Sequence, residues 1–231
     1  TFSDGSERFH KPPLFYWMIV LCFKLFGVNL LSSRLASLAA GGLLVLATYA
    51  LSHDIFKSKG RAMVSAAIMA FNLQLIYMSI RATPDAVLAL FVTLSFCGFF
   101  GLIFMRRRSH LLFALAYLGA ALAFMSKGLM GLLPVVFSIG FCLFHRRMDV
   151  RLRDLVSVRW VLAAVLLAGS WFGWVCFRHG GEALSVFFDD QLGSRPAASI
   201  LHIPMNLIGY LLGTAWDLAP WLLLVGIAWV Y

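Results

Sequence analysis

Long apolar runs separated by short polar segments make up most of the chain. A helix that crosses a membrane needs about 20 predominantly apolar residues. The runs predict seven such spans, at residues 31–52, 62–80, 86–105, 110–126, 129–145, 159–177 and 205–230. The shorter run Leu14–Gly27 follows Pro12-Pro13, a pair that suits the first turn of a helix, so we predict a juxtamembrane helix near the bilayer surface there. The pattern therefore predicts an all-α integral membrane protein, a polytopic helical bundle of about seven spans plus a juxtamembrane helix.

The composition agrees with this fold class. The 231 residues are 61% hydrophobic and 13% charged, whereas a soluble domain is about half apolar and a quarter charged. We expect one transmembrane domain, with an outer-loop remnant and the juxtamembrane helix in 1–30, six spans in 31–177, an outer loop in 178–204 and the last span in 205–231. Because the chain begins at Thr1 without an initiator methionine, we also expect it to be part of a longer protein.

The net charge of +9 comes mostly from cations that gather in every second loop. Three such groups occur: Lys57, Lys59 and Arg61; Arg106, Arg107 and Arg108; and His145, Arg146, Arg147, Arg151, Arg153 and Arg159. Loops rich in lysine and arginine stay in the cytoplasm. The charge is thus explained by membrane topology, and we expect no nucleic-acid partner.

Single charges occur at the opposite ends of the predicted spans, where the topology rule does not call for them. They are Lys11, Arg81, Asp85, Lys127, Arg178 and Arg195. One interpretation is that the cations extend their charged heads into the interface, as long basic side chains commonly do. The other is that they line one electropositive pocket for the phosphate of an anionic lipid headgroup, a ligand that suits arginine and lysine. For the set as a whole we favour the pocket.

Asp85 has two interpretations of its own. It follows Thr83 and Pro84 at the start of a predicted span, where threonine can cap the helix, proline fits the first turn and an acidic residue complements the helix dipole. The functional interpretation is a carboxylate beside the phosphate site that binds a metal ion or orients a nucleophile. Local sequence leaves both open.

The outer loop 178–204 holds further candidates. Phe187-Phe188-Asp189-Asp190 suggests a short amphipathic element, and long ordered loops are often functional. His10, His179 and His202 could be metal ligands or proton carriers. Each could equally be an interfacial or structural histidine.

Several strings resemble one family of membrane glycosyltransferases. Residues 9–46, beginning FHKPPLF, are similar to the Phe-Glu-Lys-Pro-Pro-Leu region and the following span of the ArnT/protein O-mannosyltransferase superfamily, which has the GT-C fold. RATPDAVLALF resembles a family span that opens with Thr-Asp, and AFMSKG resembles the family's Lys-Gly hairpin. WFGWVCFRHGG and LGSRPAASILHIP resemble later family passages, in the same order along the chain.

The resemblance implies a GT-C bundle and a polyprenyl-phosphate-linked sugar donor. Transfer to a lipid or protein acceptor would be inverting and assisted by a divalent metal ion. The active face would be the periplasmic or extracellular side of a bacterial inner membrane. Residues Lys11 and Lys127, with Arg178 and Arg195, would hold the donor phosphate, and Asp85 would match the family's second functional acid. The outer-face position of Arg81 adds it to the phosphate-binding set.

The chain also departs from the family pattern. The family's catalytic aspartate lies in an Asp-Glu motif after an earlier span, and the residues before Phe9 hold no match to it. His10 replaces the glutamate before the lysine, so we expect His10, with His202, as metal-ligand candidates. Two alternatives to the enzyme therefore stay open: a non-catalytic protein that binds lipid phosphate, and a transporter or flippase for an anionic lipid.

Overall fold

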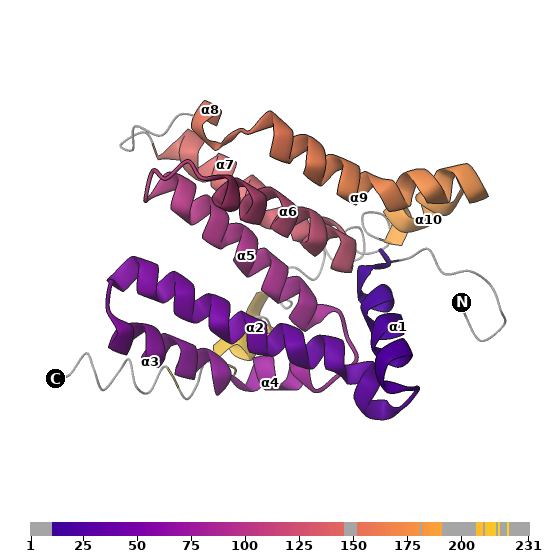
Figure 1. Ribbon diagram of the computed structural model, residues 1–231, viewed down its shortest axis with the longest axis horizontal. Coiled ribbons are helices and arrows are strands. Elements are labelled where there is room, and N and C mark those ends of the chain that lie inside the picture. Colours follow the sequence, from indigo (N-terminus) through magenta and orange to yellow (C-terminus); the bar gives the residue numbers. More distant parts are fainter. Residues whose placement is uncertain are drawn as a thin grey trace.

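The structure is a computed structural model that describes residues 11–145, 152–180 and 182–190, with the short pieces 207–209, 211–215, 217 and 221. All regular secondary structure in these residues is helical (Figure 1). The helices are α1 (Leu14–Phe26), α2 (Leu30–Phe56), α3 (Lys59–Ala70), α4 (Leu73–Ser79), α5 (Asp85–Ile103), α6 (His110–Lys127), the 3-10 helix η1 (Leu129–Leu132), α7 (Leu133–Phe144), α8 (Leu152–Leu155), α9 (Val158–His179) and α10 (Glu182–Phe188). The predicted all-α membrane class is confirmed.

Four described helices are long and apolar enough to cross a membrane: α2, α5, α6 and α9. They match four of the predicted spans. The predicted span 62–80 is wrong as a single helix, because α3 and α4 meet at a bend of 60°. Asn72 has extended backbone there, and its side chain accepts a 3.0 Å hydrogen bond from the Leu75 amide, so a new helix starts in mid-run.

The predicted span 129–145 is also different in the structure. Gly128 ends α6 with φ of 91°, and η1 precedes α7, which has only 12 residues. Most of the predicted last span, 205–230, lies outside the described residues. The described part of the chain thus has four spans by length and composition, or five if the bent pair is one, where six were predicted, and the seventh stays a prediction.

Small residues let α5 and α6 pack closely. Ser95 donates a 2.6 Å hydrogen bond from Oγ to the carbonyl oxygen of Ala116. A Cβ added at Gly98 would lie 2.3 Å from the Ala116 nitrogen, and one at Gly119 would lie 2.9 Å from the Ser95 nitrogen. Small residues commonly allow this backbone approach between membrane helices, where the lipid gives no hydrophobic drive for association. The contact fixes where the N-terminus of α5 lies relative to the C-terminus of α6.

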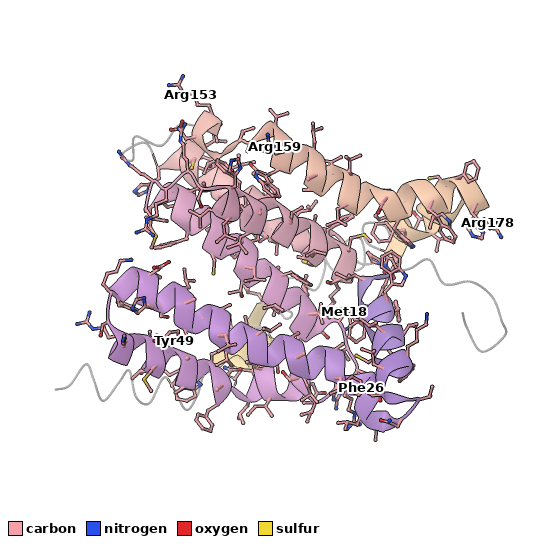
Figure 2. All side chains as sticks on the ribbon, viewed as in Figure 1. Met18, Phe26, Tyr49, Arg153, Arg159 and Arg178 are labelled. Carbon is pink, nitrogen blue, oxygen red and sulfur yellow. The ribbon has the colours of Figure 1, made fainter. Side chains whose placement is uncertain are left out.

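The bundle has two chemically different ends. At one end, called here the α1 end, α1 lies across the bundle against α2 and α6 (Figure 1). At the other, called the basic end, lie the loops after α2 and α5 and the start of α9 (Figure 1). Figure 2 shows Arg153 near the basic end and Arg178 at the far end of α9. The loops that the sequence predicted as cytoplasmic thus share one end of the bundle.

Candidate functional site

The start of α5 supplies one side of the candidate site. The helix begins at Asp85, with Pro84 before it at φ of −71°. The predicted cap by Thr83 is wrong, because no side chain caps this helix. Thr83 instead offers its carbonyl oxygen to the Ser37 hydroxyl, which donates a 3.0 Å hydrogen bond from α2. This bond ties the loop to α2 and holds Asp85 at the α1 end.

The end of α6 supplies the other side. Lys127 is the last residue of α6, and Gly128 reverses the chain with a backbone conformation that favours glycine. The following turn folds back on α6 so closely that a Cβ at Gly131 would lie 2.1 Å from the Phe124 nitrogen. The tight turn predicted after Lys127 is confirmed.

Asp85 and Lys127 form an ion pair at the α1 end. The Lys127 ammonium donates to the carboxylate oxygen Oδ1 of Asp85, across 42 positions of sequence. The two side chains are 36% (lysine) and 29% (aspartate) exposed, so the pair is neither fully solvated nor sealed from water. A phosphate oxygen could therefore reach the ammonium without an opening of the fold.

Packing of α1 brings Lys11 toward this pair. Phe15 is 3% exposed and belongs to the same core cluster as Ala86, the neighbour of Asp85. Leu14 packs on the cluster of Met125, Trp171 and Val175, and Met125 lies two positions before Lys127. Lys11 is half-buried and precedes this helix by three residues. The packing of Leu14 and Phe15 thus places the start of α1, which Lys11 precedes, at the same end of the bundle as the ion pair.

The other predicted cations have more peripheral positions. The guanidinium of Arg81 lies 3.9 Å from the ring centroid of Tyr77, an arrangement that holds the charge at the surface. Arg178 is exposed in the last turn of α9, at the right of Figure 2. Arg195, His10 and His202 lie outside the described residues, so their predicted roles stay predictions.

The described residues do not assemble a metal site. Within the described ranges, no three histidine, cysteine, aspartate or glutamate side chains gather as metal ligands. Asp85 is an oxygen donor that a divalent ion would accept, but its carboxylate is engaged by Lys127. The divalent metal ion therefore stays a prediction.

An aromatic groove beside the site was missed in the sequence. Trp17 of α1 with Ser170, Trp171 and Trp174 of α9 line a space of about 400 Å³. Two of these tryptophans stand three positions apart near the end of a span, where aromatic residues commonly mark the interface. That spacing was the signal that could have found the groove.

The short element predicted at Phe187 is confirmed as α10. Phe187 is fully buried, and its ring packs 4.9 Å from Phe172 and 6.4 Å from Phe124, measured between centroids. Asp189, after the helix, is exposed. These contacts fasten α10 to α9 and to the last turns of α6, next to Lys127.

Comparison with known proteins shows which sequences the chain resembles. The chain is 30% identical over 192 residues to an uncharacterized protein of Aquifex aeolicus, covering 82% of this chain and 37% of that protein. It is 33% identical over 183 residues to the undecaprenyl phosphate-alpha-4-amino-4-deoxy-L-arabinose arabinosyl transferase 2 of Pseudomonas fluorescens, covering 77% and 30%. It is 27% identical over 234 residues to the undecaprenyl phosphate-alpha-4-amino-4-deoxy-L-arabinose arabinosyl transferase of Aeromonas hydrophila, covering 94% of this chain and 40% of that protein.

The chain spans less than half the length of these relatives. No solved structure matches it. Residues 10–174, which contain Lys11, Asp85 and Lys127, match one family along their whole length. The chain belongs to the family described as dolichyl-phosphate-mannose-protein mannosyltransferase.

Proposed function

We propose that the chain forms the donor-binding part of a glycosyltransferase, which moves a sugar from a polyprenyl phosphate to a lipid or protein acceptor. The observation that carries the proposal is the ion pair of Asp85 and Lys127 at the α1 end of a membrane bundle, the same end to which the packing of α1 brings the segment of Lys11. The relatives named as undecaprenyl phosphate arabinosyl transferases support a polyprenyl-phosphate donor.

The charge change in such a transfer explains why cations are needed. A sugar linked to polyprenyl phosphate is a phosphodiester with one negative charge. The acceptor forms a bond to the anomeric carbon, the bond from that carbon to the phosphate oxygen breaks, and the acceptor proton passes to a base. The leaving polyprenyl phosphate then carries added negative charge. Lys127 and Lys11 would stabilise that charge more strongly in the transition state than in the bound donor.

Asp85 fits a positioning role in this proposal. Its carboxylate holds the Lys127 ammonium near the start of α5. The donor phosphate would take up a second hydrogen bond of the same ammonium, which has three N–H groups. Trp17 and Trp174, each about half exposed, would border the apolar carrier chain in the aromatic groove. No part of this scheme requires the ion pair to break.

The charges at the basic end support one orientation in the membrane. Arginine- and lysine-rich loops stay cytoplasmic, so we propose that the α1 end faces the periplasm or the exterior of a bacterial inner membrane. Acceptors at that face would be lipids or proteins.

The test measures transfer of radiolabelled sugar from a library of polyprenyl-phosphate donors in membranes that hold the protein as its gene encodes it. Lys127→Met and Lys11→Ala should each lower transfer at least about tenfold, the usual effect of losing a charged hydrogen bond. Lys24→Met is the matched control, because this exposed lysine lies in the last turn of α1. Wild-type transfer in both variants would contradict the site. Donor binding that needs Lys11, without transfer by any donor, would favour the lipid-binding or flippase alternatives.

A further inference from the structure

A second groove lies at the basic end, away from the proposed donor site. Its volume is about 420 Å³, within the range of about 300–1,000 Å³ that small-molecule sites occupy. It is formed by the C-terminal halves of α2 and α5 and by the start of α6, and α2 and α5 diverge toward this end (Figure 1). All three helices are candidate membrane spans, so the groove runs along the bilayer interior from the level of the basic loops.

The groove is apolar along its walls and charged at one rim. Ala50, Leu94 and Leu115 are among the residues that form the walls. Asp54, Arg107 and Ser109 also line it, and all three stand in the last turn of α2 or in the loop before α6. A hydrocarbon wall below a polar rim matches the shape and chemistry of a phospholipid.

The rim carries both signs of charge. Arg107 is exposed and, within the described residues, takes no carboxylate partner, whereas the neighbouring Arg108 pairs with Asp154. Asp54 pairs with Lys57 at 3.4 Å, but both side chains are half exposed or more. Such a pair contributes little and readily gives way to another cation. The guanidinium of Arg107 and the carboxylate of Asp54 thus border the same groove.

We propose that this groove binds a phospholipid whose headgroup has a phosphate and a primary ammonium, as in phosphatidylethanolamine. The phosphate would lie on Arg107 and Ser109, the ammonium on Asp54, and one acyl chain along the apolar walls. A purely anionic headgroup would meet Asp54 as a like charge, and like charges in contact discriminate strongly between ligands. The apolar face of a helix from a partner protein would supply neither an anion for Arg107 nor a cation for Asp54.

The experiment uses a phosphatidylethanolamine with a photoreactive diazirine in its acyl chain. The protein as its gene encodes it is placed in nanodiscs of phosphatidylcholine, irradiated and digested, and the labelled peptides are read by mass spectrometry. Labels should fall on residues 47–54, 94–101 and 111–115. Unlabelled phosphatidylethanolamine should compete better than phosphatidylglycerol.

Variants separate the groove from general lipid contact. Ala50→Trp should fill the groove and abolish the labels, while Leu46→Trp, on the exposed face of α2, should not. Arg107→Gln and Asp54→Asn should each lower labelling about tenfold, and Arg153→Gln, an exposed arginine at the same end, should leave it unchanged. Each variant is first shown to elute as one species in detergent.

Three results would overturn the proposal: equal competition by the two lipids, labels that survive Ala50→Trp, or no labels within the groove. The last result would mean that a protein segment fills this space. Sugar transfer is not used as the readout, so failure of this proposal leaves the proposed function untouched, and the reverse also holds.

Discussion

Removal of Asp85, Lys127 or both should separate the structural role of the ion pair from its role in transfer. The changes are Asp85→Asn, Lys127→Met and the double variant. Each single change leaves one charge without its partner at the edge of the membrane. The double change leaves neither, so the protein should regain most of the lost stability while transfer stays low.

The magnitude follows from the exposure of the two side chains. A fully exposed pair contributes about 0–1 kcal/mol, and loss of one partner of a buried pair costs about 3–5 kcal/mol. The side chains here are 36% and 29% exposed, so we expect a coupling free energy of about 1–2 kcal/mol between these limits. Asp85 also stands in the first turn of α5, where an acid contributes about 0.3–1 kcal/mol through the helix dipole. That part should not return in the double variant.

The assay has two readouts on the same purified proteins. Unfolding in SDS gives the free energy of each variant and hence the coupling energy of the cycle. Sugar transfer from a polyprenyl-phosphate donor gives the second readout. The Lys57–Asp54 pair is a matched control, because its side chains are 60% and 50% exposed, and its coupling energy should stay below about 0.5 kcal/mol.

Two outcomes would refute the reasoning. A coupling energy no larger than that of the Lys57–Asp54 control would show that Asp85 and Lys127 do not stabilise each other. Full transfer in the double variant would show that the Lys127 ammonium is not needed by the donor phosphate. A loss of transfer in Asp85→Asn that is smaller than the loss in Lys127→Met would support the positioning role of the carboxylate.

Three further results are expected. Gly98→Ala should lower the free energy of unfolding in SDS by about 1–3 kcal/mol, because the added Cβ forces α5 away from α6. Gly169→Ala is the control, because an added Cβ there meets nothing within 4 Å, and it should change this free energy by less than about 0.5 kcal/mol. Equal effects of the two changes would contradict the close contact of α5 with α6. Tyr77→Leu should raise the KM for the donor about two- to fivefold, because it releases Arg81, which is stacked on the Tyr77 ring. Tyr77→Phe, which keeps the ring, should leave the KM unchanged. A change in kcat alone would argue against a role of Arg81 in donor binding. With the native cysteines replaced, Val28→Cys should react with an impermeant maleimide on intact cells and Lys59→Cys only after permeabilisation, and the opposite pattern would invert the proposed topology.

Apolar run length was enough to predict the helices that cross the bundle without a break. It failed at the bend between α3 and α4, because Phe71 and Leu73 continue the apolar run on both sides of Asn72. One asparagine is a weak signal in a sequence, although its side chain decides where α4 begins. Helix caps act over a single turn, so a pattern averaged over a span does not register them.

The candidate site was only partly accessible to sequence reasoning. Lys127 and Asp85 could be singled out as lone charges beside apolar runs, but their direct contact depends on the close packing of α5 on α6. The rim of the second groove was not found, because Asp54 and Arg107 lie in segments that topology already explains. Only the structure shows that Asp54 and Arg107, which carry opposite charges, line the same groove.

Cationic side chains have different physical surroundings at the two ends of the bundle. At the basic end, Arg106, Arg107 and Arg108 are all exposed, as expected of charges whose task is to remain in water on one side of a membrane. At the α1 end, Lys11 and Lys127 are half-buried, and Lys127 is held by a carboxylate from another helix. Topology alone would be satisfied by exposed lysines, and burial of a charge costs free energy unless a partner compensates it. Two half-buried lysines at the end of the bundle that holds the groove of tryptophans are therefore better explained by an anionic ligand than by topology, in line with the donor site proposed above.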